Sequence, residues 1–134
     1  MSRQDLEVVR SMLATLNESG VEAALDQIHP DFEGVTPPEL SPEPDTYRGH
    51  EGIRRYFAGF EGVMDEVRWE ADELMEAPDD RVVAGIRLVT RSVATELELE
   101  LAVWQLCTVR DGKVLRIEGF AKREDALRAA GIEP

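Results

Sequence analysis

The stretch that decides the fold is residues 95–109, which read TELELELAVWQLCTV. Glutamates at positions 96, 98 and 100 alternate there with the apolar residues Leu97, Leu99, Leu101 and Val103. Successive side chains of a strand point to opposite faces of a sheet, so strict alternation indicates a β-strand. We therefore expect a long strand with its apolar side on the core and its glutamates in solvent.

The segments on either side of this strand continue the sheet. Asp111-Gly112 is a strong hairpin signal, and residues 113–120 return as a last strand. Residues 82–91 also alternate, and Pro78-Asp79-Asp80 before them is typical of a turn. These features predict that neighbouring strands pair as antiparallel hairpins.

A fourth antiparallel strand begins at Val67. Its period of two places Trp69, Ala71 and Glu73 on the same side as Val67. Beyond the last strand, residues 123–130 are predicted to form a short helix that Gly131 stops.

The first half of the chain has the helical period instead. Leu6, Val9, Leu13 and Leu16 predict a helix that ends at about Asn17. Residues 21–28 predict a shorter helix stopped by His29-Pro30, and residues 50–62 predict a third. Residues 31–47 carry several prolines and are expected to be mostly loop, with a short strand near residues 32–35. Helices followed by strands indicate an α+β domain with the helices gathered on one face of the sheet.

Composition narrows the class of protein. The 134 residues fit one domain, residues 1–134, with 43% hydrophobic and 32% charged residues. No apolar run approaches the roughly 20 residues of a membrane span, and the first residues lack the apolar stretch of a signal peptide. A net charge of −13 without a basic cluster disfavours nucleic acid and anionic membranes as partners. With Cys107 as the lone cysteine, we expect a cytoplasmic protein.

At this point the chain resembles the SnoaL-like branch of the nuclear transport factor 2-like superfamily over essentially its whole length. The resemblance implies a cone-shaped, curved antiparallel sheet packed on three N-terminal helices around a pocket, with a short C-terminal helix. It rests on local signatures at Leu16-Asn17, His29-Pro30-Asp31-Phe32, residues 47–53, Asp111-Gly112-Lys113-Val114 and residues 122–131.

This superfamily includes ketosteroid isomerases, polyketide cyclases, epoxide hydrolases, dehydratases and non-catalytic binding domains, so fold alone does not select an activity. By resemblance, the carboxylate base of the isomerases falls at Thr36, and a hydroxyl is not a base near neutral pH. Their tyrosine donor, its supporting tyrosine and their protonated aspartate fall near Ser11, Phe57 and Gln105. All four positions are replaced, which argues against steroid isomerisation. The Asp-Arg-Asp arrangement of the epoxide hydrolases is not found among inward strand positions.

Five residues are candidates for lining the pocket. Gln105 is an inward amide that needs partners, supplied either by a ligand or by the protein itself. Trp69 either offers a flat surface to a ligand or packs in the core. Tyr47 and Tyr56 flank the pocket mouth in the family geometry, as ligand donors or as packing residues. Glu33 is the nearest candidate for the acid of a cyclase, or a solvated residue on an edge strand.

No metal or cofactor is expected. His29 and His50 are the only histidines, and no third ligand lies at metal-binding spacing. His29 is interpreted as the last residue of a helix and His50 as a cap of the next one. Cys107 is interpreted as a small core residue.

Trp104 and Leu106 fall on the sheet face opposite Gln105. An exposed apolar patch usually marks an interface, so we expect a homodimer through this face, unless the C-terminal helix covers it.

Three functions remain open. The leading hypothesis is a domain that binds a small, mostly apolar molecule. The first alternative is a cofactor-independent enzyme of the cyclase, isomerase or hydrolase type, acting on a cyclic carbonyl compound. An inward carboxylate with a raised pKa would favour that enzyme. The second alternative is a dimerisation or protein-interaction domain whose cavity is filled by its own side chains.

Overall fold

The computed structural model describes residues 2–36, 46–61, 66–92 and 94–133, with the side chains of residues 57–61 left aside. The helices are α1 (Ser2–Ser19), α2 (Val21–Ala24), the 3₁₀ turn η1 (Leu25–Gln27), α3 (Gly49–Glu61) and α4 (Arg123–Ala129). The strands are β1 (Ile28–Val35), β2 (Thr46–Arg48), β3 (Glu66–Ala77), β4 (Arg81–Ser92), β5 (Leu97–Arg110) and β6 (Lys113–Phe120).

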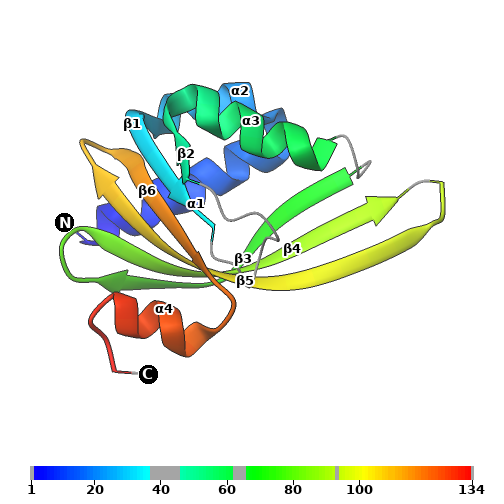
Figure 1. Ribbon diagram of the computed structural model, residues 1–134. Coiled ribbons are helices and arrows are strands. Elements are labelled where there is room, and N and C mark those ends of the chain that lie inside the picture. The colour runs from blue at the N-terminus through cyan, green and yellow to red at the C-terminus, as the bar shows by residue number, and fades with distance from the viewer. Residues whose placement is uncertain (1, 37–45, 62–65, 93, 134) are drawn as a thin grey trace.

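The strands form one curved, six-stranded sheet in the order β2-β1-β6-β5-β4-β3. Helices α1, α2 and α3 cover its concave side, and α4 lies on the opposite side (Figure 1). This is the α+β architecture of the nuclear transport factor 2-like cone, and the four antiparallel strands β3 to β6 are confirmed.

The first two strands depart from the prediction. β1 runs parallel to β6, which makes the sheet mixed, and it begins at Ile28, ahead of the residue where a strand was expected. His29 therefore lies in a strand and is not the last residue of a helix. β2 begins at Thr46 in the segment predicted as loop, ends one residue beyond it at Arg48, and pairs antiparallel with β1. Both errors have one cause, because β1 pairs with β6 and β2 pairs with β1, and the local sequence of a strand does not reveal such partners.

A β-bulge in β3 changes which side chains face the helices. Ala71 is opposite Ile86, but Glu73 is already opposite Gly85, so Asp72 is the extra residue. The bulge moves Glu73 to the outer face, where Arg123 of α4 donates a hydrogen bond to it at 2.8 Å. The predicted inward position of Glu73 is wrong for this reason.

Each face of the sheet has its own apolar cluster. The inner cluster packs α1 against the sheet through side chains such as Val9, Leu13, Val82 and Val114. The outer cluster packs α4 on the sheet, with Leu127 only 2% exposed. Trp104 and Leu106 belong to this outer cluster, so the C-terminal helix covers the patch from which a dimer was predicted. The homodimer itself stays a prediction.

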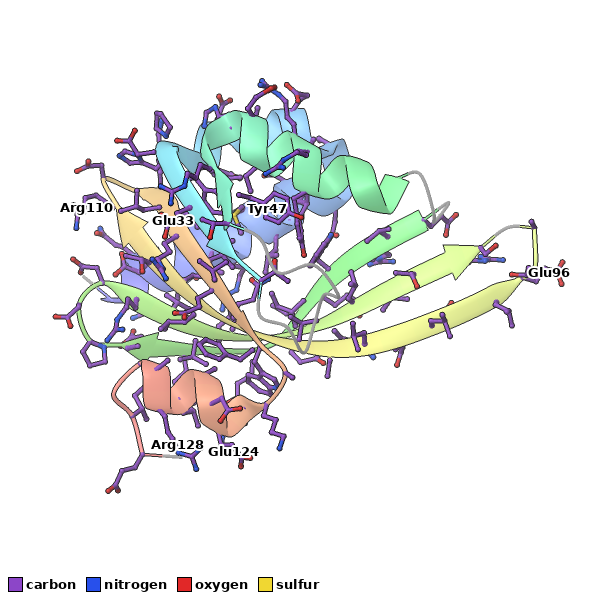
Figure 2. All side chains as sticks on the ribbon, viewed as in Figure 1. Glu33, Tyr47, Glu96, Arg110, Glu124 and Arg128 are labelled. Carbon is purple, nitrogen blue, oxygen red and sulfur yellow. The ribbon has the colours of Figure 1, made fainter. Side chains whose placement is uncertain are left out.

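The distal ends of β4 and β5 extend beyond the helices as an arm, with Glu96 at its tip (Figures 1 and 2). Leu97, Leu99 and Leu101 lie on this arm and are 61%, 59% and 53% exposed. The alternation in this strand is confirmed, but the expected burial of its leucines is wrong. β6 pairs with β5 only from Trp104 onward, so the core ends before the leucines begin.

No helix among the described residues is long and apolar enough to cross a bilayer.

Candidate functional site: an apolar cavity

A cavity of about 740 Å³ lies between the concave side of the sheet and the helices. Its volume falls within the range of small-molecule sites, about 300–1,000 Å³. Most of its lining is apolar and comes from α1, β1, β4, β5 and β6, including Met12, Leu13, Leu16, Ile28, Phe32, Leu88, Val103 and Ile117.

The polar side chains of the described lining are few, and all but one are uncharged. The uncharged ones are Thr36, Tyr47, Tyr56, Thr90 and Gln105. The exception is Glu100, whose carboxylate lies 3.7 Å from the Arg87 guanidinium on the outer side of β5. The inner surface of the cavity therefore offers hydrogen bonds without a fixed charge.

Gln105 lines the cavity, as predicted from the period of β5. Its Oε1 lies 4.0 Å from the Cys107 Sγ, at the outer limit of a weak S–H···O contact. Burial raises the pKa of the Cys107 thiol to about 12, so this thiol stays protonated and is not a nucleophile near neutral pH. The strand thus presents an amide to the cavity beside an inert thiol.

Tyr47 and Tyr56 meet at the cavity as an edge-to-face pair. Their ring centroids are 5.1 Å apart at an interplanar angle of 73°. Arg55 stacks on Tyr47, with its guanidinium carbon 4.8 Å from the ring centroid. Tyr47 extends beneath α3 (Figure 2). Burial, with a smaller contribution from Tyr47, raises the pKa of Tyr56 to about 12, so its hydroxyl is a donor and not a base.

Trp69 lines the cavity and is only 5% exposed, so its indole both packs in the core and forms part of the cavity wall. Asn17, at the end of α1, holds the backbone at this point. Its Nδ2 donates to the Trp69 carbonyl at 2.8 Å, and the Trp69 N–H donates to its Oδ1 at 2.8 Å. The side chain of Asn17 therefore positions the indole at the cavity wall.

Glu33 is the one predicted site residue that the described cavity lining does not include. Its carboxylate accepts a hydrogen bond from Arg116 at 2.7 Å and lies 3.5 Å from the Arg48 guanidinium. On β1, Phe32 faces the cavity, and the alternation of the strand turns the neighbouring Glu33 away. Its role as a cavity acid is corrected to that of an ion-pair partner on the outer surface.

Two of the four positions that the resemblance aligns with ketosteroid isomerase residues belong to the described cavity lining. Thr36 and Gln105 line the cavity. Ser11 is exposed and accepts a hydrogen bond from Gln27, and the helix instead presents Met12, Leu13 and Leu16 to the cavity. Phe57 lies in α3, with its side chain outside the described residues.

The two histidines lie outside the described cavity lining, and each has a structural partner. Asp31 N–H donates to His29 Nδ1 at 3.0 Å, and His50 Nε2 lies 2.8 Å from the Ile28 carbonyl oxygen. Burial raises the pKa of Asp5, but Asp5 is not one of the cavity-lining residues. Within the described part of the chain, no group of His, Cys, Asp or Glu is arranged to hold a metal ion.

Sequence reasoning missed Thr90 and Asn17. Thr90 continues the inward alternation of Ala84, Ile86 and Leu88 on β4, so the period of that strand could have found it. Asn17 belongs to a local family signature, but its role was not foreseen, because its hydrogen bonds reach a strand far along the chain.

The model of the SnoaL-like domain family matches residues 9–117, which is most of the chain and includes all or part of each helix and strand that lines the cavity. The chain belongs to the SnoaL-like domain family. No curated protein gives a significant sequence match.

Solved structures share the fold of this SnoaL-like protein. TerC, co-crystallised with polyporic acid, is 26% identical, with a TM-score of 0.76 over 95% of this chain and 97% of that chain. A nuclear transport factor 2-like protein of unknown function from Burkholderia pseudomallei is 18% identical, with a TM-score of 0.74 and the same coverage. A putative SnoaL-like polyketide cyclase from Jannaschia is 15% identical, with a TM-score of 0.71 over 99% of this chain and 95% of that chain.

Proposed function

We propose that this SnoaL-like protein binds a small, mostly apolar and uncharged molecule in the cavity. The observation that carries the proposal is the cavity of about 740 Å³ with an apolar lining and a few uncharged polar groups. Burying apolar surface supplies the affinity, about 25 cal/mol per Å² before the costs of association are subtracted.

The polar groups define what the ligand carries. The protonated Tyr56 hydroxyl and the Gln105 amide both offer donors, so we expect a carbonyl or hydroxyl oxygen on the ligand. No cation lies among the described lining residues, and burying a carboxylate without a partner is costly, so free acids are disfavoured. The co-crystal of TerC with polyporic acid is consistent with ligand binding in this fold.

An enzymatic role has less support than binding. General acid–base chemistry of the cyclase type needs a carboxylate that faces the ligand. The described lining offers only Glu100, which is ion-paired with Arg87 on the outer side of the strand. The protein-interaction alternative has less support too, because the described side chains leave the cavity open.

The first test is native mass spectrometry of the purified protein, under gentle conditions and again after denaturation. We expect an additional mass that is released on unfolding and whose chemistry identifies the ligand. A protein that carries nothing, and stays empty against a library of neutral cyclic ketones and phenols, would contradict the proposal.

A pair of variants locates the bound molecule. Ile117 lines the cavity, while its neighbour Glu118 faces the other side of β6. We expect Ile117→Trp to fill part of the cavity and abolish retention of the ligand, whereas Glu118→Trp retains it. Equal retention by both folded variants would place the ligand outside the cavity.

A further inference from the structure

The arm carries an apolar surface that the described part of the chain leaves uncovered. Leu97, Leu99 and Leu101 are all more than half exposed, and they are the large apolar side chains with that exposure among the described residues. We call these three residues the leucine stripe. They share one face of β5, so their exposed areas form one continuous patch, which usually marks an interaction site.

The same segment has an open backbone edge. β6 pairs with β5 from Trp104 to Arg110, so among the described residues the stretch from Leu97 to Val103 pairs with β4 alone. Unpaired N–H and C=O groups at a sheet edge are a template for another strand. The edge and the leucine stripe are independent features, and they coincide.

The hydrogen bonds between Asn17 and Trp69 fix the backbone direction across β3, β4 and β5, and so show which residues of β5 direct their backbone N–H and C=O groups at the open edge. Asn17 takes both backbone groups of Trp69, which therefore point away from β4. In antiparallel strands, opposite residues alternate between hydrogen-bonded pairs, whose backbone N–H and C=O groups point at each other, and non-hydrogen-bonded pairs, whose backbone groups point away from each other. Leu88 lies opposite Trp69, so its backbone groups point away from β3 and toward β5. There they pair with the backbone groups of Leu101.

Because backbone direction alternates along a strand, the neighbours of Leu101 point the other way. The backbone groups of Glu98, Glu100 and Ala102 are therefore directed at the open edge.

We propose that this edge pairs with the same segment of a second copy of the chain, antiparallel, about a two-fold axis at Glu100. A two-fold interface must be complementary to itself. The segment LELELAV meets this condition, because Leu99 then faces the partner's Leu101, and Leu97 faces the partner's Val103. Glu98 faces the partner's Ala102, so no glutamate opposes another except at the axis.

Charge at the axis is partly neutralised within each copy. Glu100 would lie opposite the partner's Glu100, and like charges directly opposite weaken a strand pair. In each copy the Arg87 guanidinium lies 3.7 Å from Glu100, but it also lies 2.6 Å from Glu70 and 3.7 Å from Asp72, so it neutralises the charge of Glu100 only in part. The net charge of −13 per chain still opposes association. We therefore expect the dimer to strengthen as salt screens that repulsion.

The pairing joins the two cavities. Leu99 and Leu101 line the cavity mouth, so the partner's leucines extend the apolar wall of each mouth. The copies would therefore cooperate in covering an apolar ligand. This interface differs from the sheet face that α4 covers, and it does not depend on which ligand is bound.

Sedimentation of the full chain over a range of concentrations tests the proposal. The Ala102 N–H points to the open edge, so Ala102→Pro removes a donor that no neighbouring strand of the described chain uses. We expect a dimer for the wild type and for the matched Ala102→Ser variant, and monomers for Ala102→Pro and for Leu97→Lys. Circular dichroism and melting curves of the variants verify that the monomers are folded.

Either of two results overturns the proposal. One is a wild type that stays monomeric at every concentration and salt level, in which case the leucine stripe belongs to the ligand or to another protein. The other is a dimer that survives both Ala102→Pro and Leu97→Lys, which places the interface elsewhere. Ligand retention in the native mass spectrum is read separately, so failure of the dimer and failure of ligand binding are distinguishable.

Oxidative cross-linking tests the register. Glu100 and the partner's Glu100 would have Cα atoms about 5.5 Å apart, within the range of about 4.4–6.8 Å that a disulfide spans. We expect Glu100→Cys to give a covalent dimer rapidly. The control, Glu98→Cys, places its cysteines four positions apart, about 14 Å at 3.4 Å per residue, and should remain monomeric in denaturing gels. Cys107 is completely buried and does not interfere. Equal cross-linking of both variants would exclude this register.

Discussion

Asn17 and Trp69 are joined by two hydrogen bonds, each 2.8 Å long, through which a side-chain amide takes the place of a neighbouring strand. β3 is an edge of the sheet, and this contact ties it to the end of α1. The same contact holds the indole against the cavity, so one residue of the first helix links the stability of the fold to the shape of the site.

Replacing Asn17 should destabilise the protein. Asn17→Ala removes both hydrogen bonds from the Asn17 side chain to the Trp69 backbone, at a cost of about 1–3 kcal/mol in the free energy of unfolding. Urea denaturation measures this change. Glu18→Ala, one exposed residue further on, is the control and should stay within about 0.5 kcal/mol of the wild type. If the two variants unfold alike, the amide does not hold β3.

Tyr56 should ionise far above the ordinary tyrosine range. The chain has two tyrosines, so Tyr47→Phe leaves Tyr56 as the only phenol. Burial is the main cause of the shift, so its pKa should remain near 12 in this variant. Ultraviolet absorbance during a pH titration reports the ionisation directly. A midpoint near 10 in the folded protein would show that the hydroxyl is open to water.

The shift of Tyr56 also has a consequence for stability. A pKa of about 12 in the folded protein exceeds the unfolded value of about 10, so the folded state binds its proton more tightly. The contribution of the protonated Tyr56 to the free energy of unfolding is fully present below about pH 10 and is lost as the pH rises from about 10 to 12. Tyr56→Phe should remove this part of the decline, as measured by unfolding at fixed pH values in that window.

Leu127 should be the residue through which α4 is held on the sheet. It is 2% exposed in the outer cluster, and truncation of a buried leucine to alanine costs about 2–5 kcal/mol. We expect Leu127→Ala to loosen α4 and to increase the binding of a hydrophobic dye near Trp104 and Leu106. Arg128→Ala changes the exposed neighbour and is the control. Loss of stability without dye binding would mean that α4 stays in place.

Cys107 should react with thiol reagents only when the protein opens. Its side chain is fully buried and its pKa is raised to about 12, so the reactive thiolate is scarce and inaccessible. Native protein should react orders of magnitude more slowly than protein in urea, as followed by the absorbance of a coloured disulfide reagent. Glu98→Cys supplies an exposed thiol that reacts at once. Fast labelling of native Cys107 would reveal local opening of β5.

The sequence by itself determined the elements with strong local signals. The Leu-Glu alternation of β5, the Asp111-Gly112 turn and the apolar period of α1 each depend on residues close together in the chain. Both turn residues have positive φ angles, 55° and 72°, as the hairpin signal requires. The period of two was also sufficient to direct Gln105 of β5 and Trp69 of β3 toward the cavity.

Tertiary structure alone decided the features that depend on distant partners. The bulge at Asp72 turned Glu73 outward, the parallel pairing with β6 made a strand that includes His29-Pro30, and Arg116 held Glu33 away from the cavity. The leucines of β5 show most clearly what local sequence does not determine. Alternation predicts that they share a face, but burial depends on what packs against that face, and β6 ends before it reaches them.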